Sequence, residues 1–373
     1  MPGCQYCRKI KRGYQSSTAL DYPLYTGDYM NKILEEDFSY IAGNIDMPWD
    51  QFNGKSILIT GAGGFLGSLL VRFFYYLNDK HDRNIRLIVL VRNEEKARRL
   101  LGDRAVIIQD DICNVSQIPY DIDYLFHCAA ETNSRKMIES PVEVSEGIVV
   151  GTFNIMRLAR QKKIKSAVYI SSMEVYGNVP EKADKVDEND CGVIDVLCAR
   201  SCYPMGKRMA ENICFNYYYQ YGVPVKIARL AQTFGAGVLE TDNRVFAQFA
   251  RSVMSKEDIV LHTDGSSIGN YCYSADAILG LIFILLKGVN GQAYNVVNEE
   301  LTMSIKQMAE IVANKVANGS ISVKYEIPEN NVYGYAAARK NRLSSKRLCS
   351  LGWKPMYGME DMYNRMIAAW KLK

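Results

Sequence analysis

The stretch Ser56-Ile-Leu-Ile-Thr60-Gly-Ala-Gly-Gly-Phe-Leu-Gly67 decides the fold, because a short apolar segment runs directly into a glycine turn. Gly61, Gly64 and Gly67 recur every three residues, and glycine permits both a tight turn and a close approach of backbone amides to a pyrophosphate. The helix expected over 66–77 points its N-terminal amides and its dipole at the same anion. The stretch therefore predicts a strand, turn and helix that bind a dinucleotide.

Apolar strands and helices alternate along the chain after this turn. We expect strands over 86–91, 105–109, 124–128, 167–171 and 225–230, and helices over 148–160 and 203–221. This alternation predicts an α/β fold, a Rossmann-like doubly wound parallel sheet with helices on both faces.

The pattern changes near residue 232, where expected helices over 244–254, 275–287 and 304–318 alternate with a short strand over 294–297. Residues 1–52 form an N-terminal extension with a short helix over 29–41, since they precede the glycine turn. The dinucleotide-binding domain is expected over 53–232. Residues 233–373 are expected to form mainly a smaller, α/β substrate-binding lobe.

The amino-acid composition gives no sign of a nucleic-acid or membrane partner. The chain is 48% apolar and 23% charged with a net charge of +4, which is ordinary for a globular protein and gives no reason to expect nucleic acid or a membrane. The most apolar stretch, 277–286, is too short to span a bilayer, and no apolar segment follows the basic residues of the N-terminus. We therefore expect a cytoplasmic protein. Cys4 and Cys7 have too few companion ligands to predict a metal site.

Tyr203 and Lys207 form a Tyr-x-x-x-Lys pair on one face of an expected helix. A phenol has a pKa near 10, which is too high for a base at neutral pH. A neighbouring ammonium and a positively charged nicotinamide stabilise the phenolate, so Tyr203 can accept a hydroxyl proton as hydride leaves the carbon.

With these motifs in place, the sequence from about 54 to 370 resembles the extended short-chain dehydrogenases/reductases. The motifs are TGAGGFLG at 60–67, HCAAET at 127–132, YISSMEVYG at 169–177, SCYPMGKRMAE at 201–211, RLAQTFG at 229–235 and LGWKP at 351–355. Within the NAD-dependent epimerase/dehydratase family it is most similar to UDP-glucuronate decarboxylases and dTDP-glucose 4,6-dehydratases. The resemblance implies a tightly bound NAD, a nucleotide-sugar substrate, a role in polysaccharide biosynthesis and a homodimer formed through the Tyr203 helix.

The resemblance also implies the site residues. Ser172 should hydrogen-bond the reacting sugar oxygen beside Tyr203 and Lys207, and Glu174 should lie near sugar C5 and C6. The cofactor would contact Tyr203, Lys207 and the residues Gly61, Gly64, Phe65, Leu66, Gly67, Arg92, Asp111, Ile112, Cys128, Ala129 and Ala130. The substrate would contact Thr132, Met173, Gln232 and Arg244, with Gln232 and Arg244 near its diphosphate.

The residues after the fifth expected strand favour one reaction. Dehydratases carry an acid where this chain has Met173, and a thioether cannot protonate a departing C6 hydroxyl. Decarboxylation needs no such acid, because oxidation at C4 makes a β-keto acid. We therefore expect oxidation of a UDP-uronate at C4, loss of carbon dioxide and re-reduction. A cation such as Arg244, or a shared proton, must then offset the repulsion between Glu174 and the substrate carboxylate.

Several departures leave alternatives open. The second strand ends at Arg92 without the carboxylate typical of NAD sites, so Arg92 either pairs with a 2′-phosphate of NADP or lies on the adenine face. Relatives often carry a diphosphate-binding Arg within 267–270, and a helix Asn where this chain has Ile148. The alternatives are a 4-epimerase, a 4,6-dehydratase, an NADP-dependent reductase or a non-catalytic dinucleotide-binding protein. Ser172, Tyr203 and Lys207 together argue against the last.

Overall fold

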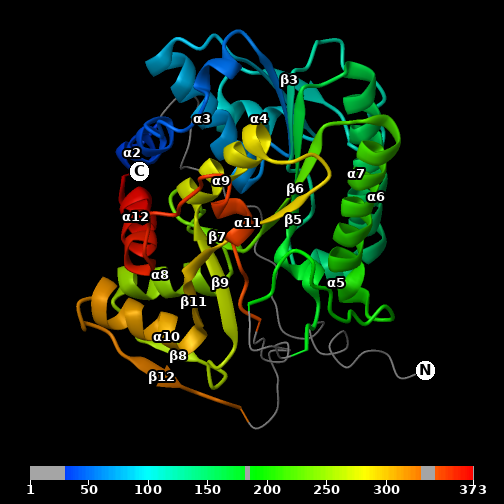
Figure 1. The fold of residues 1–373 in the computed structure, drawn as a ribbon. Coiled ribbons are helices and arrows are strands. Elements are labelled where there is room, and N and C mark those ends of the chain that lie inside the picture. The colour runs from blue at the N-terminus through cyan, green and yellow to red at the C-terminus, as the bar shows by residue number, and fades with distance from the viewer. Residues whose placement is uncertain (1–29, 181–184, 329–340, 373) are drawn as a thin grey trace.

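The computed structural model describes residues 30–180, 185–328 and 341–372 (Figure 1). Within these ranges a seven-stranded sheet has the order β10-β6-β5-β4-β1-β2-β3, and every neighbouring pair is parallel. Its strands are β1 (Ser56–Thr60), β2 (Arg86–Val91), β3 (Val106–Gln109), β4 (Tyr124–His127), β5 (Ser166–Ser172), β6 (Val225–Leu230) and β10 (Ala293–Val296). The predicted doubly wound parallel sheet is confirmed.

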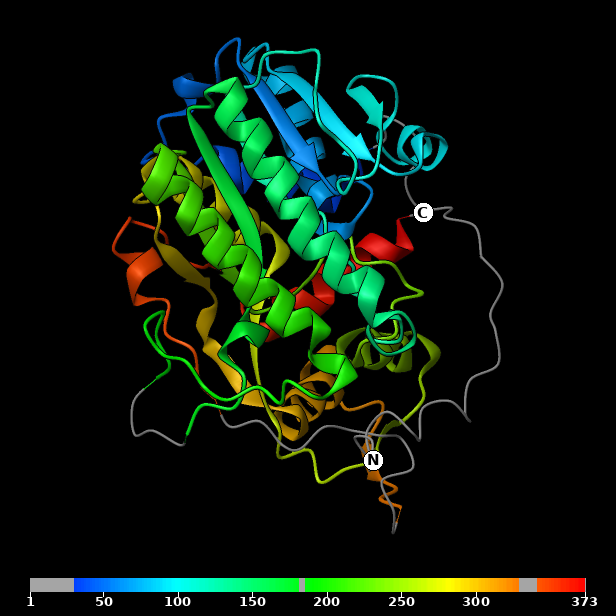
Figure 2. The same ribbon diagram turned by 90° about the vertical axis from the view of Figure 1, so that its right-hand side faces the viewer.

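Helices cover both faces of this sheet (Figures 1 and 2). One face carries α6 (Pro141–Lys162) and α7 (Cys202–Tyr221), and the other carries α3 (Phe65–His81) and α9 (Ser274–Lys287), with α4 (Glu94–Leu101) beside β3. The side chains of β1 alternate between two buried apolar clusters, one on each face of the sheet. Ile57 and Ile59 belong to one cluster, and Leu58 belongs to the other. Burial of both sheet faces explains why these strands are almost entirely apolar.

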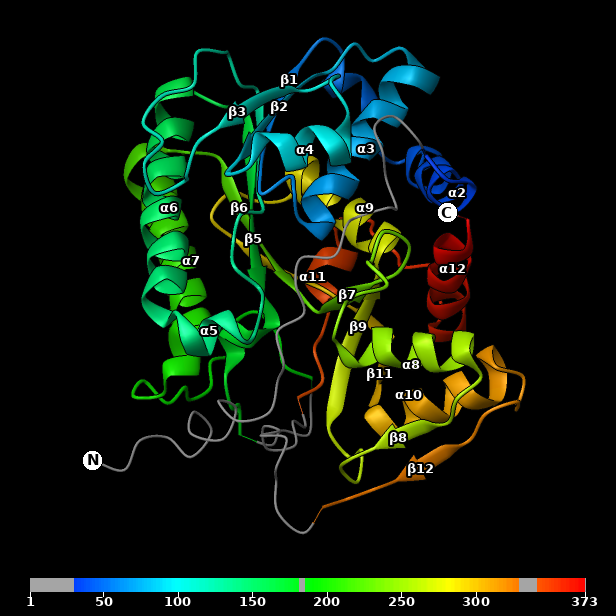
Figure 3. The ribbon, with the colours of Figure 1, turned by 180° about the vertical axis from the view of Figure 1, so that it is seen from behind.

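A second lobe lies below the sheet in Figure 3. It contains a three-stranded sheet in the order β11-β9-β7 and the pair β12-β8. Their bounds are β7 (Gln232–Phe234), β8 (Ile259–Leu261), β9 (Ile268–Tyr273), β11 (Asn298–Ser304) and β12 (Val323–Tyr325). The helices are α8 (Val245–Ser255), α10 (Ile305–Ile311) and α12 (Met359–Lys371), and the helix expected over 304–318 continues after α10 as a π-helical turn, Val312–Val316.

The chain crosses between sheet and lobe more than once after residue 232. β10 pairs with β6, α9 packs on β5 and β6, and α11 (Lys346–Cys349) packs on β10. The segment after 232 thus supplies one edge of the main sheet in addition to the lobe.

The described part of the N-terminal extension contains α2 (Lys32–Ala42) and the 3₁₀ turn Trp49–Phe52. Asn31 caps α2 through its side chain, and α2 packs on α3, α9 and α12. The buried carboxylate of Asp37 accepts hydrogen bonds from Tyr273 Oη at 2.7 Å and Arg365 Nε at 3.0 Å. These bonds fasten the extension to the C-terminal helix. Cys4 and Cys7 lie outside the described residues.

The order of the strands fixes where a ligand can enter. From β1 the chain moves outward through β2 and β3, and it then returns to β4 on the other side of β1. The carboxyl ends of β1 and β4 therefore flank a topological switch point, where open α/β sheets bind ligands. No helix in the described residues is long and apolar enough to cross a membrane.

Candidate active site

The glycine turn between β1 and α3 has the shape that a pyrophosphate requires. Gly61 has a φ of +69°, and a Cβ there would lie 2.7 Å from the backbone of Ala129. A Cβ on Gly67 would lie 2.4 Å from the carbonyl oxygen of Gly61. Gly64 begins α3 without a side-chain cap, so the first amides of α3, including those of Phe65 and Leu66, lack intrahelical partners. This cradle fits a phosphate group.

The segment after β4 closes one side of the cradle. The amide of Ala129 donates to Thr60 Oγ1 at 3.2 Å, and Thr60 Oγ1 lies 2.8 Å from His127 Nδ1. Burial, and then the charge of Lys207, lower the pKa of His127 to about 3. His127 is therefore neutral, and its contacts position the backbone of 128–130 against the turn.

The expected adenosine contacts lie at the ends of β2 and β3. Arg92 is exposed directly after β2. Asp111 accepts a hydrogen bond from the amide of Cys113 at 2.8 Å, while Asn154 of α6 donates to the carbonyl of Ile112 at 3.0 Å. These bonds fix the loop that carries Asp111 and Ile112 beside α6.

Lys207 lies in α7 and is 2% exposed. Its Nζ donates to the carbonyl oxygen of Ile170 in β5 at 2.6 Å and lies 5.8 Å from the ring centroid of Tyr203. Burial lowers the pKa of Lys207 to about 8, opposed by Cys128 and Glu211. The ammonium is thus held between α7 and β5, the strand that ends at Ser172.

Tyr203 is buried at the start of α7. Burial, with the charge of Glu174, raises the pKa of Tyr203 to about 12, while a hydrogen bond with Ser172 and the charges of Arg200 and Arg244 lower it. In this geometry the phenol is protonated at neutral pH. A role as a base would require further positive charge beside the ring.

Ser172 and Glu174 lie directly after β5, where the short helix η3 (Met173–Tyr176) begins. Ser172 Oγ accepts a hydrogen bond from the amide of Glu174 at 3.2 Å. Nη2 of Arg200 lies 3.0 and 2.9 Å from the two carboxylate oxygens of Glu174. The structure therefore brings Ser172, Glu174, Tyr203 and Lys207 into one cluster and adds a cation that the sequence analysis missed.

The expected partner of Glu174 needs a correction. Arg244, which precedes α8, is half exposed and forms its ion pair with Asp242, with Nη2 and Oδ2 2.6 Å apart. Arg200, from the 3₁₀ turn η4 (Ala199–Ser201), is the cation beside Glu174. The signal in the sequence was its position three residues before Tyr203, which places it near the same end of the helix.

The remaining expected substrate contacts lie on three separate segments of the chain. Met173 is partly buried in η3, and Thr132 is exposed in the loop after β4. Gln232 begins β7, where it pairs with Tyr271 of β9.

The segment where relatives often carry an arginine has a structural role here. A Cβ on Gly269 would lie 2.2 Å from the hydroxyl of Tyr271, so the ring of Tyr271 takes the space that a longer side chain would need. The side chain of Asn270 accepts a hydrogen bond from the amide of Leu343 and donates one to the carbonyl of Asn341.

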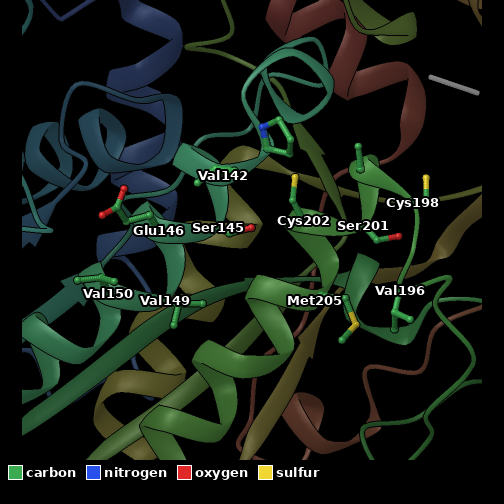
Figure 4. A pocket seen from close by; sticks show the side chains of 12 residues that line it. Val142, Ser145, Glu146, Val149, Val150, Val196, Cys198, Ser201, Cys202 and Met205 are labelled. Atoms are coloured by element: carbon green, nitrogen blue, oxygen red, sulfur yellow. The ribbon is translucent and has the colours of Figure 1, made fainter. Parts of the chain in front are cut away.

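A groove lies between the first turns of α6 and α7 and the segment 196–201 that precedes α7 (Figure 4). Apolar side chains dominate its lining, among them Val142, Val149, Val150, Val196 and Met205. Val142 is 73% exposed and Val196 is 67% exposed. The face is therefore apolar and uncovered in the single chain.

Comparisons with known proteins identify the family and relatives of this chain. The model of the NAD dependent epimerase/dehydratase family matches residues 57–297. UDP-glucuronic acid decarboxylase 3 of Arabidopsis thaliana is 30% identical over 308 residues, which are 82% of this chain and 86% of that protein. UDP-glucuronic acid decarboxylase 1 of Xenopus tropicalis is 27% identical over 315 residues, 84% of this chain and 71% of that protein.

A solved structure shares the fold. UDP-glucuronic acid 4-epimerase from Bacillus cereus, in complex with UDP-glucuronic acid and NAD, has a TM-score of 0.68 and 20% identity, covering 85% of this chain and 99% of that one. At this identity the similarity concerns the fold alone.

Proposed function

We propose that this chain decarboxylates a UDP-uronate with bound NAD. The chain belongs to the NAD-dependent epimerase/dehydratase family and is a nucleotide-sugar enzyme. The observation that carries the proposal is the set of groups around Tyr203. Ser172, Glu174 and Arg200 lie around the phenol. Met173 follows Ser172 in the sequence, at the position where the dehydratases that this chain resembles carry an acid. The decarboxylases among its relatives support the same reaction.

The glycine cradle fits NAD, since any side chain at Gly61 or Gly67 would collide with the backbone that shapes it. When bound, NAD supplies the redox chemistry, taking two electrons from sugar C4 and returning them later. The amides of Phe65 and Leu66 would hold its pyrophosphate, and Asp111 and Ile112 would face its adenine ring. The exposed Arg92 favours a second candidate, an NADP-dependent reductase, because a guanidinium pairs well with a 2′-phosphate.

The chain's own groups move the protons. Tyr203 takes the proton from the C4 hydroxyl, since its pKa falls once positive charge is added next to the ring. Lys207 keeps a positive charge behind the phenol, and Ser172 hydrogen-bonds the C4 oxygen. After the C5–C6 bond breaks and carbon dioxide leaves, Glu174 is placed to relay a proton to C5. Tyr203 then returns its proton to the C4 oxygen.

We further propose a homodimer formed through α6 and α7. These helices expose Phe153, Met209, Phe215 and Tyr219 to solvent, and the apolar groove of Figure 4 lies on the same pair of helices. A partner copy would bury this face. Cytoplasmic location is part of the proposal, because Cys214 and Cys272 are free thiols buried in the apolar core, as is usual for proteins of a reducing compartment.

The test of the reaction is to supply UDP-glucuronate and dTDP-glucose separately and to measure the product masses. Loss of carbon dioxide from UDP-glucuronate is the expected result. Loss of water from dTDP-glucose, with UDP-glucuronate unchanged, would show that Met173 does not prevent dehydration and would overturn the proposal.

A further inference from the structure

The guanidinium of Arg200 is only partly used by the protein. One nitrogen, Nη2, contacts both carboxylate oxygens of Glu174, at 3.0 and 2.9 Å. Its other described contact is with the ring of Tyr203, whose centroid lies 5.9 Å from Cζ. Within the described residues, Nε and Nη1 make no hydrogen bond. Since a guanidinium carries five N–H groups, three of them remain available to a ligand.

The position of these donors matters as much as their number. The side chain of Arg200 is 18% exposed and that of Glu174 is 22% exposed, so the pair is mostly withdrawn from water but still accessible. A planar guanidinium suits a carboxylate better than any other common ligand group, because two parallel N–H bonds match its two oxygens.

We propose that Arg200 binds the C6 carboxylate of the substrate and thereby selects nucleotide-uronates over nucleotide-hexoses. The inference rests on the proposed function, since that function brings a uronate to Tyr203. Arg200 would hold Glu174 through Nη2 and the substrate carboxylate through Nη1 and Nε. The arginine then offsets the repulsion between the two carboxylates, and it sets C6 beside Glu174.

The other cations near Tyr203 do not fit this role. Lys207 is buried and directs its ammonium at the carbonyl oxygen of Ile170. Arg244 already forms an ion pair with Asp242 and is half exposed. The segment 267–270, where relatives often carry an arginine, has Gly269 instead, and the hydroxyl of Tyr271 lies where a side chain at 269 would begin.

The experiment compares the binding of two nucleotides that differ at C6. UDP-glucuronate carries the carboxylate there, and UDP-glucose carries a hydroxymethyl group. Dissociation constants are measured by calorimetry on cofactor-loaded protein in a Tyr203→Phe background, which blocks turnover during the titration. Arg200→Gln should weaken UDP-glucuronate at least tenfold and change UDP-glucose by less than about twofold. Arg200→Lys keeps the charge but loses the planar fork of N–H groups, so it should weaken UDP-glucuronate less than Arg200→Gln does.

Two further variants make the test specific. Arg98→Gln removes an exposed arginine that pairs with Glu94 in α4, and it should leave both constants unchanged. Glu174→Gln frees Nη2 of Arg200 and removes a negative charge, so the preference for UDP-glucuronate should rise about tenfold.

The outcomes separate the two claims. Equal weakening of both nucleotides by Arg200→Gln, or no change in either, would overturn the role of Arg200. An unchanged or lower preference for UDP-glucuronate over UDP-glucose in Glu174→Gln would also overturn it. This variant tests the role of Arg200 even if Arg200→Gln does not fold. Failure of the wild-type enzyme to release carbon dioxide would instead refute the proposed reaction, and the binding preference would still decide the role of Arg200.

Discussion

Replacing Lys207 with methionine should make the cofactor-free protein more stable while abolishing its activity. Lys207 is 2% exposed, and burial lowers its pKa from 10.5 to about 8. The folded chain therefore holds its ammonium at a cost, which methionine, with a similar length and no charge, does not carry. The proposed mechanism needs that same charge behind Tyr203, so the variant should lose activity.

The magnitude follows from the shift in pKa. At about 1.4 kcal/mol for each unit, a shift of this size corresponds to about 3 kcal/mol at pH 7. The lost hydrogen bond to the carbonyl oxygen of Ile170 removes about 1 kcal/mol of this gain. The net gain of about 2 kcal/mol should raise Tm by roughly 2–3 °C in a chain of this length.

The dependence on pH has a definite sign. The folded pKa of Lys207 lies below the unfolded value, so the unfolded chain holds more protons between pH 8 and pH 10.5. The free energy of unfolding of the wild type therefore rises with pH across this window. The advantage of Lys207→Met should be greatest below pH 8 and should disappear near pH 10.5. Paired thermal melts of wild type and variant measure it.

Lys226 provides the matched control. It is buried in β6, donates to Ser166 Oγ at 2.7 Å, and burial lowers its pKa to about 8 as well. Lys226→Met should give a similar gain in stability with activity retained, because Lys226 lies outside the catalytic cluster. The reasoning is refuted if Lys207→Met lowers Tm at pH 7, or if its advantage over the wild type does not shrink as the pH rises above 8.

Three other predictions concern the proton acceptor, the cofactor and its cradle. Tyr203→Phe should bind cofactor as the wild type does but lose turnover by about 10²–10⁴-fold, so near-normal turnover would remove Tyr203 from the mechanism. Nucleotide extracted from purified protein should have the mass of NAD, and NADP as the sole occupant would show that Arg92 pairs with a 2′-phosphate. Gly61→Ala should unfold at lower temperature and lose cofactor, because its Cβ would lie 2.7 Å from backbone atoms, whereas a Cβ on Gly63 would have no atom within 4 Å. Melting curves of Gly61→Ala and Gly63→Ala should therefore differ, and equal stability would contradict the geometry of the turn.

The main sheet could be predicted from the sequence because its strands are buried on both faces. Such strands are continuous apolar runs, and β5 (Ser166–Ser172) extends the expected strand by one residue at each end. β10 was expected as a strand near 294–297, but nothing local to four residues shows that they pair with β6. Pairing partners far apart in the chain are chosen by the packing of the whole sheet.

The C-terminal helix α12 was missed although its signal was present. Met362, Met366 and Trp370 recur every four residues and are buried on one side of the helix. The contacts that fasten α2 to this helix, through Asp37 and Arg365, join residues more than 300 positions apart. No sequence spacing predicts such a contact.

The contact between Arg200 and Glu174 is harder to predict from the sequence than the other contacts of the site. A Tyr-x-x-x-Lys motif is visible because both members share one helix face, and Ser172 and Glu174 share one strand end. Arg200 contacts Glu174 only because η4 leads into α7 opposite η3, a relation that exists only after folding. Burial and Glu174 raise the pKa of Tyr203, and Ser172 and Arg200 oppose that rise. Because the pKa still reaches about 12, the phenol is protonated at neutral pH. In the proposed mechanism, proton transfer to Tyr203 therefore requires further positive charge beside its ring.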